Sequence, residues 1–140
     1  MNMKKRELYG SIRDVYHQLQ KHLDKAIEEH NISYVQFGVI QVLAKSGKVS
    51  MSKLIENMGC VPSNMTTMIQ RMKRDGYVAT EKNQNDQRET LVFLTEKGEE
   101  IREKVDVKYE GFLQGNCSCF TTEEEQKLQE LLLKWKHHLV

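Results

Sequence analysis

Two short amphipathic segments joined by a glycine-containing turn restrict the possible folds of this chain more than any other feature. Residues 52–58 and 62–75 each repeat apolar side chains at helical spacing, with a short connection between them. Gly59 can adopt the left-handed backbone conformation that redirects a chain after a helix, and Pro62 suits the first position of the next helix. Two short helices connected in this way form a helix-turn-helix.

The hydrophobic period changes immediately after these two segments. Residues 77–82 and 90–94 are short β-prone runs, and residues 83–88 between them are polar, with no apolar anchor. Two such runs around a polar turn predict a β-hairpin. A hairpin with a charged tip directly after a helix-turn-helix indicates the winged variant of that motif.

The other segments are predicted to be helices. Ser33 and Gln36 form a capping box at the start of the helix before the helix-turn-helix. Thr95 is expected to cap a helix that reaches about Phe112, and Thr122 is expected to open a second capping box at the start of the last helix. The first helix is long, because its apolar stripe runs for about 20 residues, roughly 30 Å at helical rise.

The predicted fold class is mainly α with a small β-hairpin wing. One domain spans residues 1–140. Within it, residues 33–95 form a winged helix-turn-helix lobe, and long terminal helices in 1–30 and 96–140 form a dimerisation region. The chain carries no internal repeat or linker that would divide it.

The second helix of the predicted motif has two different faces. Its inward face carries Met65, Met68, Ile69 and Met72. Its outward side chains are of types that bind base edges and phosphates in a major groove, and no acid occurs before Asp75. A solvated helix face is the alternative, but it is usually rich in Glu and Lys. The candidate DNA-binding residues are Pro62, Ser63, Asn64, Thr66, Thr67, Gln70, Arg71 and Arg74.

The hairpin tip supplies a second candidate contact. Arg88 could insert into a narrow, electronegative minor groove. The alternative is an ion pair with Asp86, which contributes little when exposed. Both are compatible, since an acid two residues away can also orient the guanidinium.

Net charge does not contradict this interpretation. The whole chain carries 21 Lys and Arg against 20 Asp and Glu, whereas DNA-binding domains are typically basic. Residues 45–93, however, hold eight basic against five acidic side chains, and residues 94–140 hold seven against ten. The positive excess therefore falls on the segment predicted to meet DNA.

The terminal segments carry more apolar surface than one small lobe needs. Stripes of this kind call for a second surface, so we expect dimerisation, with packing inside one chain as the alternative. The candidate dimer-interface residues are Leu8, Ile12, Val15, Leu19, Phe112, Phe120, Leu128, Leu131, Leu132 and Trp135.

With these residues in view, the chain resembles the MarR family of bacterial transcription regulators. The resemblance covers nearly the whole chain, and its most specific parts are the pair Asp86 and Arg88 and the stretch Leu94-Thr95-Glu96-Lys97-Gly98. It implies an obligate homodimer that reads a palindromic operator in double-stranded DNA, and we expect this regulator to be a repressor. It also implies that the first and last two helices interlock between subunits.

The resemblance implies release from DNA by a signal, which in similar proteins is a small aromatic effector, an oxidant or, occasionally, a metal. Cys60 is a candidate redox site, because a helix N-terminus favours a thiolate. A small turn or core residue is the alternative at this position. Cys117 and Cys119 fit two incidental thiols better than a redox or metal pair.

The sequence gives little support to other classes of function. No catalytic or cofactor-binding motif occurs, and no HxxxH or CxxC spacing indicates a metal site, so we expect no enzyme, cofactor or metal. No run approaches about 18 apolar residues, and no secretory signal is visible, so we expect a cytoplasmic protein without a membrane partner. The main rival is a winged-helix module that binds another protein.

Overall fold

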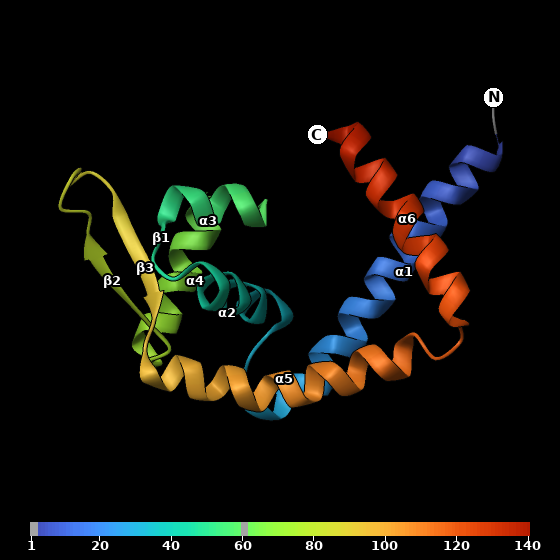
Figure 1. The fold of residues 1–140 in the computed structure, drawn as a ribbon. Coiled ribbons are helices and arrows are strands. Elements are labelled where there is room, and N and C mark those ends of the chain that lie inside the picture. Colours follow the sequence, from blue (N-terminus) through green and yellow to red (C-terminus); the bar gives the residue numbers. More distant parts are fainter. Residues whose placement is uncertain (1–2, 60–61) are drawn as a thin grey trace.

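The computed structural model describes residues 3–59 and 62–140. The chain is mostly helical, and its elements form two groups joined by one long helix (Figure 1). The elements are α1 (Met3–Ile27), the 3-10 turn η1 (Glu28–His30), α2 (Tyr34–Ser46), β1 (Val49–Ser50), α3 (Met51–Met58), α4 (Pro62–Arg74), β2 (Val78–Lys82), β3 (Thr90–Leu94), α5 (Glu96–Asn116) and α6 (Thr122–Leu139). Helices α2, α3 and α4 gather with the sheet, and α5 runs from this lobe to the place where α1 and α6 lie.

The lobe has a continuous apolar core. Leu54 from α3 and the inward residues Met65, Ile69 and Met72 from α4 are fully or almost fully buried. Helix α2, the sheet, α5 and the end of α1 complete the core with Phe37, Val39, Ile40, Leu43, Val78, Val92, Val105 and Ile27. The predicted helix-turn-helix and wing are therefore confirmed as one packed unit.

The sheet has three antiparallel strands in the order β1-β3-β2, so the predicted two-stranded hairpin was incomplete. Strand β1 pairs Val49 with Val92, and β2 pairs Val78 with Leu94. A two-residue strand is too short to show a period in the sequence. It forms because Val49 is buried against the hairpin, which is a tertiary contact.

The observed helix boundaries agree with the predicted ones in two places and differ from them in three. Ser33 forms the expected capping box with Gln36, and Thr95 caps α5. The last capping box, however, begins at Thr121 and not at Thr122. Both threonines have a glutamate three positions later, so the sequence pattern could not distinguish them. Of the two serines expected as N-cap candidates, Ser50 and Ser52, it is Ser50 that caps α3, so this helix begins at Met51 and not at residue 52.

Helix α5 is also longer than expected. It continues past Phe112 to Asn116, although two glycines lie in its last turns. No neighbouring atom lies within 4 Å of a Cβ built at Gly111 or Gly115, and the Asn116 side chain donates a 2.8 Å hydrogen bond to the carbonyl of Phe112. The glycines are therefore tolerated in the helix and do not end it.

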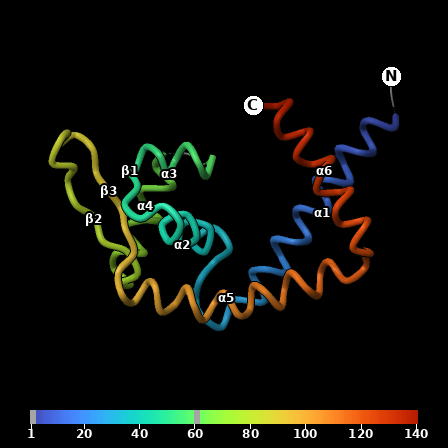
Figure 2. The backbone as a smooth tube through the Cα atoms, in the orientation of Figure 1, coloured from blue at the N-terminus to red at the C-terminus, as the bar shows by residue number. Residues whose placement is uncertain are grey.

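The far end of the molecule is built differently from the lobe. Helix α6 has no buried residue, and the first half of α1 is equally exposed. Figure 2 shows the start of α1 and the end of α6 on one side of the molecule, with the wing on the other. Among the described residues, no helix is both long and apolar enough to cross a membrane.

Candidate nucleic-acid interface

Helix α4 presents a polar face to solvent. Gly59 adopts the left-handed conformation at φ 62°, as the turn requires, and α4 starts at Pro62. Met65, Ile69 and Met72 hold one side of the helix against the core. The eight predicted DNA-binding side chains are all exposed on the other side: Pro62, Ser63, Asn64, Thr66, Thr67, Gln70, Arg71 and Arg74.

Two threonines on this face have their hydroxyl protons engaged within the helix. Thr66 donates to the carbonyl of Pro62 and Thr67 to that of Ser63, each at 3.0 Å. Their oxygen lone pairs remain free to accept, and their methyl groups stay exposed. These groups can accept from a cytosine or adenine amino group and contact a thymine methyl.

The C-terminal end of α4 is basic. Arg71 and Arg74 are exposed, and Arg74 Nε lies 3.6 Å from the carboxylate of its neighbour Asp75. Lys73 donates a 2.9 Å hydrogen bond to Thr80 Oγ1 on β2. Lys73 was not singled out from the sequence, and it joins the helix to the wing. Its only sequence signal is its place among the basic residues of the last turn.

The wing tip is shaped by hydrogen bonds. One oxygen of Asp86 accepts from both the backbone N–H and Nε of Arg88, each at 3.1 Å. Asn83 Nδ2 donates to the Glu89 carboxylate at 2.6 Å across the base of the tip. The Arg88 side chain is nonetheless 93% exposed, so its terminal nitrogens face solvent. The Asp86–Arg88 ion pair exists and orients the guanidinium without covering it.

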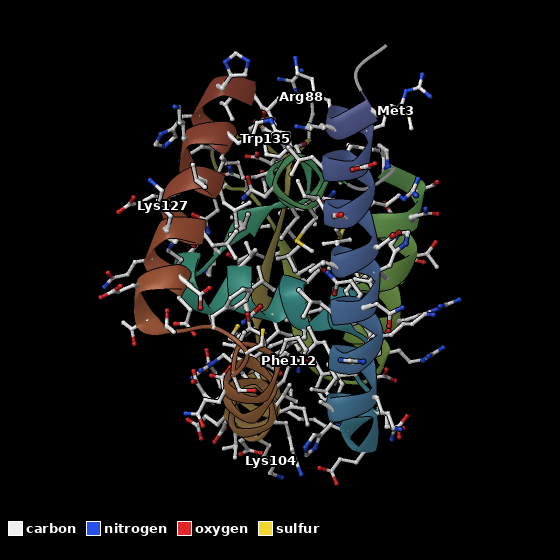
Figure 3. The ribbon with its side chains drawn as sticks, turned by 90° about the vertical axis from the view of Figure 1, so that its right-hand side faces the viewer. Met3, Arg88, Lys104, Phe112, Lys127 and Trp135 are labelled. Carbon is white, nitrogen blue, oxygen red and sulfur yellow. The ribbon has the colours of Figure 1, made fainter. Side chains whose placement is uncertain are left out.

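The tip of the β2–β3 wing projects from the lobe (Figure 1). Figure 3 shows Arg88 near the top of the view and Lys104 of α5 at the bottom. Lys82, on the strand beside the tip, is exposed and donates a long 3.4 Å hydrogen bond to Thr90. The wing therefore offers a second cation that the sequence did not single out.

Residues 94–98 lock α5 to the end of α4. Thr95 Oγ1 donates to the carbonyl of Gly76 at 2.5 Å and accepts from the N–H of Gly98 at 3.0 Å. Lys97 Nζ donates to the carbonyl of Asp75 at 2.8 Å and lies 5.2 Å above the ring of Tyr77. A Cβ at Gly98 would collide with the carbonyl oxygen of Tyr77, so this close approach requires glycine.

Comparison with known proteins assigns this arrangement to a family. The MarR family model matches residues 32–90, which contain the helix-turn-helix and most of the wing. A MarR-like protein of known structure from Bacillus cereus ATCC 10987 is 78% identical; the alignment covers 99% of this chain and 100% of that one, with a TM-score of 0.90. This chain belongs to the MarR family.

Two further relatives are more distant. The homoprotocatechuate degradative operon repressor of Escherichia coli is 28% identical over 106 residues, which are 76% of this chain and 72% of the repressor. A mutant of MarR from E. coli, in a structure with operator DNA, shares the fold at 23% identity and a TM-score of 0.87, covering 96% and 98% of the two chains. MarR-family proteins are transcription regulators and not enzymes, and the same holds for this member.

The predicted dimer-interface residues divide into two groups in this MarR-family chain. Most of them lie exposed on α1 and α6, and six line an open apolar cleft of about 480 Å3 between these helices: Leu8, Ile12, Leu128, Leu131, Leu132 and Trp135. Phe112 differs, because it packs on its own core with its ring 6.1 Å from that of Tyr109. Leu19 is half-buried.

A second cleft, of about 390 Å3, lies between α1, α2, α3 and α5. We name it the tyrosine cleft, after Tyr16, Tyr34 and Tyr109. Its other lining residues are Gln20, Leu23, Val35, Phe37, Gly38, Gln41 and Met58. Sequence reasoning missed this site, because its residues come from four separate helices and share no motif.

Among the cysteines, Cys60 was the candidate redox site and Cys117 and Cys119 were expected to be incidental thiols. Cys60 lies outside the described residues. Cys117 and Cys119 are exposed in the turn between α5 and α6. Within the described part of the chain, no three His, Cys, Asp or Glu side chains come together as metal ligands.

One charged contact links the turn η1 to α5. Lys108 Nζ lies 2.9 Å from Glu29 Oε1, and its hydrogen bond and positive charge lower the pKa of the Glu29 carboxyl below the ordinary value. Both side chains are largely exposed, so this pair adds little to stability.

Proposed function

We propose that this MarR-family regulator is a repressor that binds a palindromic site in double-stranded DNA as a homodimer. The observation that carries the proposal is the outward face of α4. It holds hydroxyl, amide and guanidinium groups and no carboxylate along the whole helix, next to a wing whose Arg88 is almost fully exposed.

The two parts of this surface suit different grooves. Asn64 and Gln70 can bind adenine through their amides, and Arg71 can bind guanine or a phosphate, so α4 fits the major groove. Arg88 extends from a narrow hairpin and suits the minor groove, where the negative potential is high. Lys73 and Lys82 can add phosphate contacts between these two positions.

A homodimer would cover the apolar surface that the single chain leaves open. Leu131, Leu132 and Trp135 of α6 and Leu8 and Ile12 of α1 are all exposed. A two-fold axis at this end of the molecule would repeat the α4 surface. Two recognition helices about 34 Å apart would then read the two halves of a palindrome.

A small aromatic effector would release the repressor. The tyrosine cleft lies between the helices assigned to dimerisation and those assigned to DNA, and four of its residues are aromatic. A ligand there would contact both groups of helices at once. The E. coli relative represses an operon for degradation of an aromatic acid, which is consistent with such a signal.

Fluorescence anisotropy with a labelled random duplex at low salt tests the proposal. We expect binding that weakens as salt rises, because each neutralised phosphate contributes a slope of about −0.9 in log affinity against log salt. Selection from genomic fragments should then yield a palindromic site that binds more tightly than the random duplex. No binding to either DNA would overturn the proposal in favour of a protein-binding winged helix.

A further inference from the structure

The base of the wing is fixed to the end of α4 by backbone hydrogen bonds. The N–H of Tyr77 donates to the carbonyl of Met72 at 2.9 Å. The N–H of Gly76 donates to the carbonyl of Lys73 at 3.0 Å, and Gly76 adopts the left-handed conformation that this kind of helix end requires, with φ 86°. Val78, the first residue of β2, is buried. These contacts determine where the chain leaves the helix, and they all lie at the base of the hairpin.

A side-chain hydrogen bond joins α4 to β2 further along the hairpin. Lys73 Nζ donates to Thr80 Oγ1 at 2.9 Å. Thr80 lies directly opposite the buried Val92 of β3, and opposite residues of an antiparallel pair share a face of the sheet. Lys73 therefore reaches β2 on the face that is turned toward the core.

A second lysine contacts β2 on the other face of the sheet. Lys48 Nζ lies 2.6 Å from Glu81 Oε1 and 5.1 Å from the centroid of the Phe93 ring. Glu81 directly follows Thr80, so its side chain points to the opposite face. The carboxylate of Glu81 pairs with the charge of Lys48, whereas the hydroxyl of Thr80 is uncharged. The strand is thus held from both faces, and the contact to Thr80 is the one that reaches the recognition helix.

The place of this contact along the hairpin gives it leverage on the tip. Glu81 and Lys82 are exposed, and the tip begins after them, about 7 Å beyond Thr80 at the rise of a β-strand. Arg88 belongs to this tip, which projects from the lobe in Figure 1. A tilt of the hairpin at Thr80 would therefore displace Arg88 further than Thr80 itself. Side chains that bind a ligand must be held within about 0.5 Å of their productive position.

We propose that Lys73 is a positioning residue, which sets the angle between α4 and the wing through its hydrogen bond to Thr80. It thereby places Arg88 at the minor groove while α4 occupies the major groove. This inference rests on the proposed function, because it assumes that α4 and Arg88 contact the same DNA. It gives Lys73 a role that a phosphate contact alone would not have.

Thr80→Val tests this role, because it removes the hydroxyl, keeps the charge of Lys73 and suits a β-strand. In anisotropy titrations with the palindromic site selected from genomic fragments, Thr80→Val should weaken binding about threefold, and Thr80→Ser should restore it. The matched control is Thr90→Val in the same hairpin, where the hydroxyl accepts a 3.4 Å hydrogen bond from Lys82 of the neighbouring strand. The control should bind as the wild type does. Wild-type affinity in Thr80→Val, or equal losses in the two valine variants, would overturn the proposal.

A double-mutant cycle with Arg88 separates positioning from a general effect on the fold. In an Arg88→Ala background the contact at the tip is already lost, so Thr80→Val should cause no further loss of affinity. A merely structural role would weaken binding equally in both backgrounds, and fully additive losses would therefore contradict the role of Lys73. Failure of the wild type to bind any duplex would instead contradict the proposed function.

Discussion

The lobe and the α1–α6 end of this protein are built from the same kind of amphipathic helix, and they differ in what covers the apolar face. Leu54 of α3 is 0% exposed, whereas Leu131 of α6 is 51% exposed. The lobe closes its core with three helices, a sheet and parts of α1 and α5. At the other end, the cleft between α1 and α6 stays open.

This difference shows that an apolar period predicts which face of a helix must be buried. It does not predict whether the covering surface comes from the same chain or from another. A helix hydrophobic on one face is stable where a second surface removes that face from water. In the lobe this surface comes from the same chain. At the α1–α6 end we propose that it comes from a second copy, and charge follows the same division, with basic side chains in excess in 45–93 and acidic ones in 94–140.

The largest effect is expected at the joint between the two regions. Gly98→Ala places a Cβ against the carbonyl oxygen of Tyr77, which belongs to the backbone and cannot swing away. We expect a loss of about 3 kcal/mol in the free energy of unfolding, the upper end of the usual cost of overpacking. Urea denaturation measures this loss. The matched control is Gly111→Ala in the same helix, where nothing lies within 4 Å, and it should gain about 0.5 kcal/mol. Equal stabilities for the two variants would contradict the close approach.

A variant at Trp135 tests whether a second copy of the chain covers the α1–α6 end. Its side chain is 38% exposed in the single chain and lines the open cleft with Leu8 and Ile12. If a second copy covers it, Trp135→Ala should weaken dimerisation by about 2 kcal/mol or more. Analytical ultracentrifugation across a concentration series measures this change.

Lys127→Ala is the control for Trp135→Ala. Figure 3 shows Trp135 on the side of α6 toward α1 and Lys127 pointing away from it. The exposed contact of Lys127 with Glu130 is 3.9 Å long, so its loss should leave the dimer unchanged. A wild-type sedimentation profile for Trp135→Ala would mean that the α1–α6 end is not a subunit interface.

A smaller effect, confined to the lobe, is expected at Arg88. Arg88→Ala should weaken DNA binding by more than about 1 kcal/mol. Dimerisation and stability should stay unchanged, because the side chain is 93% exposed and its ion pair with Asp86 lies in solvent. Anisotropy titration with the selected palindrome measures the loss. An unchanged affinity would remove the wing from the DNA-binding surface and confine the contact to α4.

The smallest effect is expected at Glu29 and Lys108. Because Lys108 lowers the pKa of Glu29 in the folded chain, the pair stabilises the protein above the ordinary carboxyl pKa. That contribution is lost as the pH falls through the lowered value. The melting temperature of Lys108→Ala should therefore lie slightly below that of the wild type at neutral pH. The two should agree in acid, once Glu29 is protonated. A difference that persists in acid would point to a packing role for the Lys108 stem.

Much of the site could be predicted from the sequence, because its parts are local. The turn at Gly59, the start of α4 at Pro62 and the separation of polar from apolar side chains on α4 depend on residues near one another in the chain. The hairpin and its charged tip follow from neighbouring residues in the same way, and the structure confirms this architecture.

Features that depend on residues far apart in the chain were not predicted from the sequence, or were predicted at the wrong position. Strand β1 exists because Val49 meets Val92, and the tyrosine cleft exists because four helices converge. The last cap lies at Thr121 and not at Thr122, two positions with equal local patterns, and nothing in the structure explains the choice.

The sequence by itself determined which segments are helices, which residues of α4 face outward and that the terminal helices carry more apolar surface than a small lobe can bury. These properties follow from side-chain period and backbone preference, which act over a few residues. Only the tertiary structure decided that the lobe closes its own core while α1 and α6 leave theirs open. That outcome depends on which surfaces pack together in the folded protein. The apolar period of a helix does not identify the surface that will cover it.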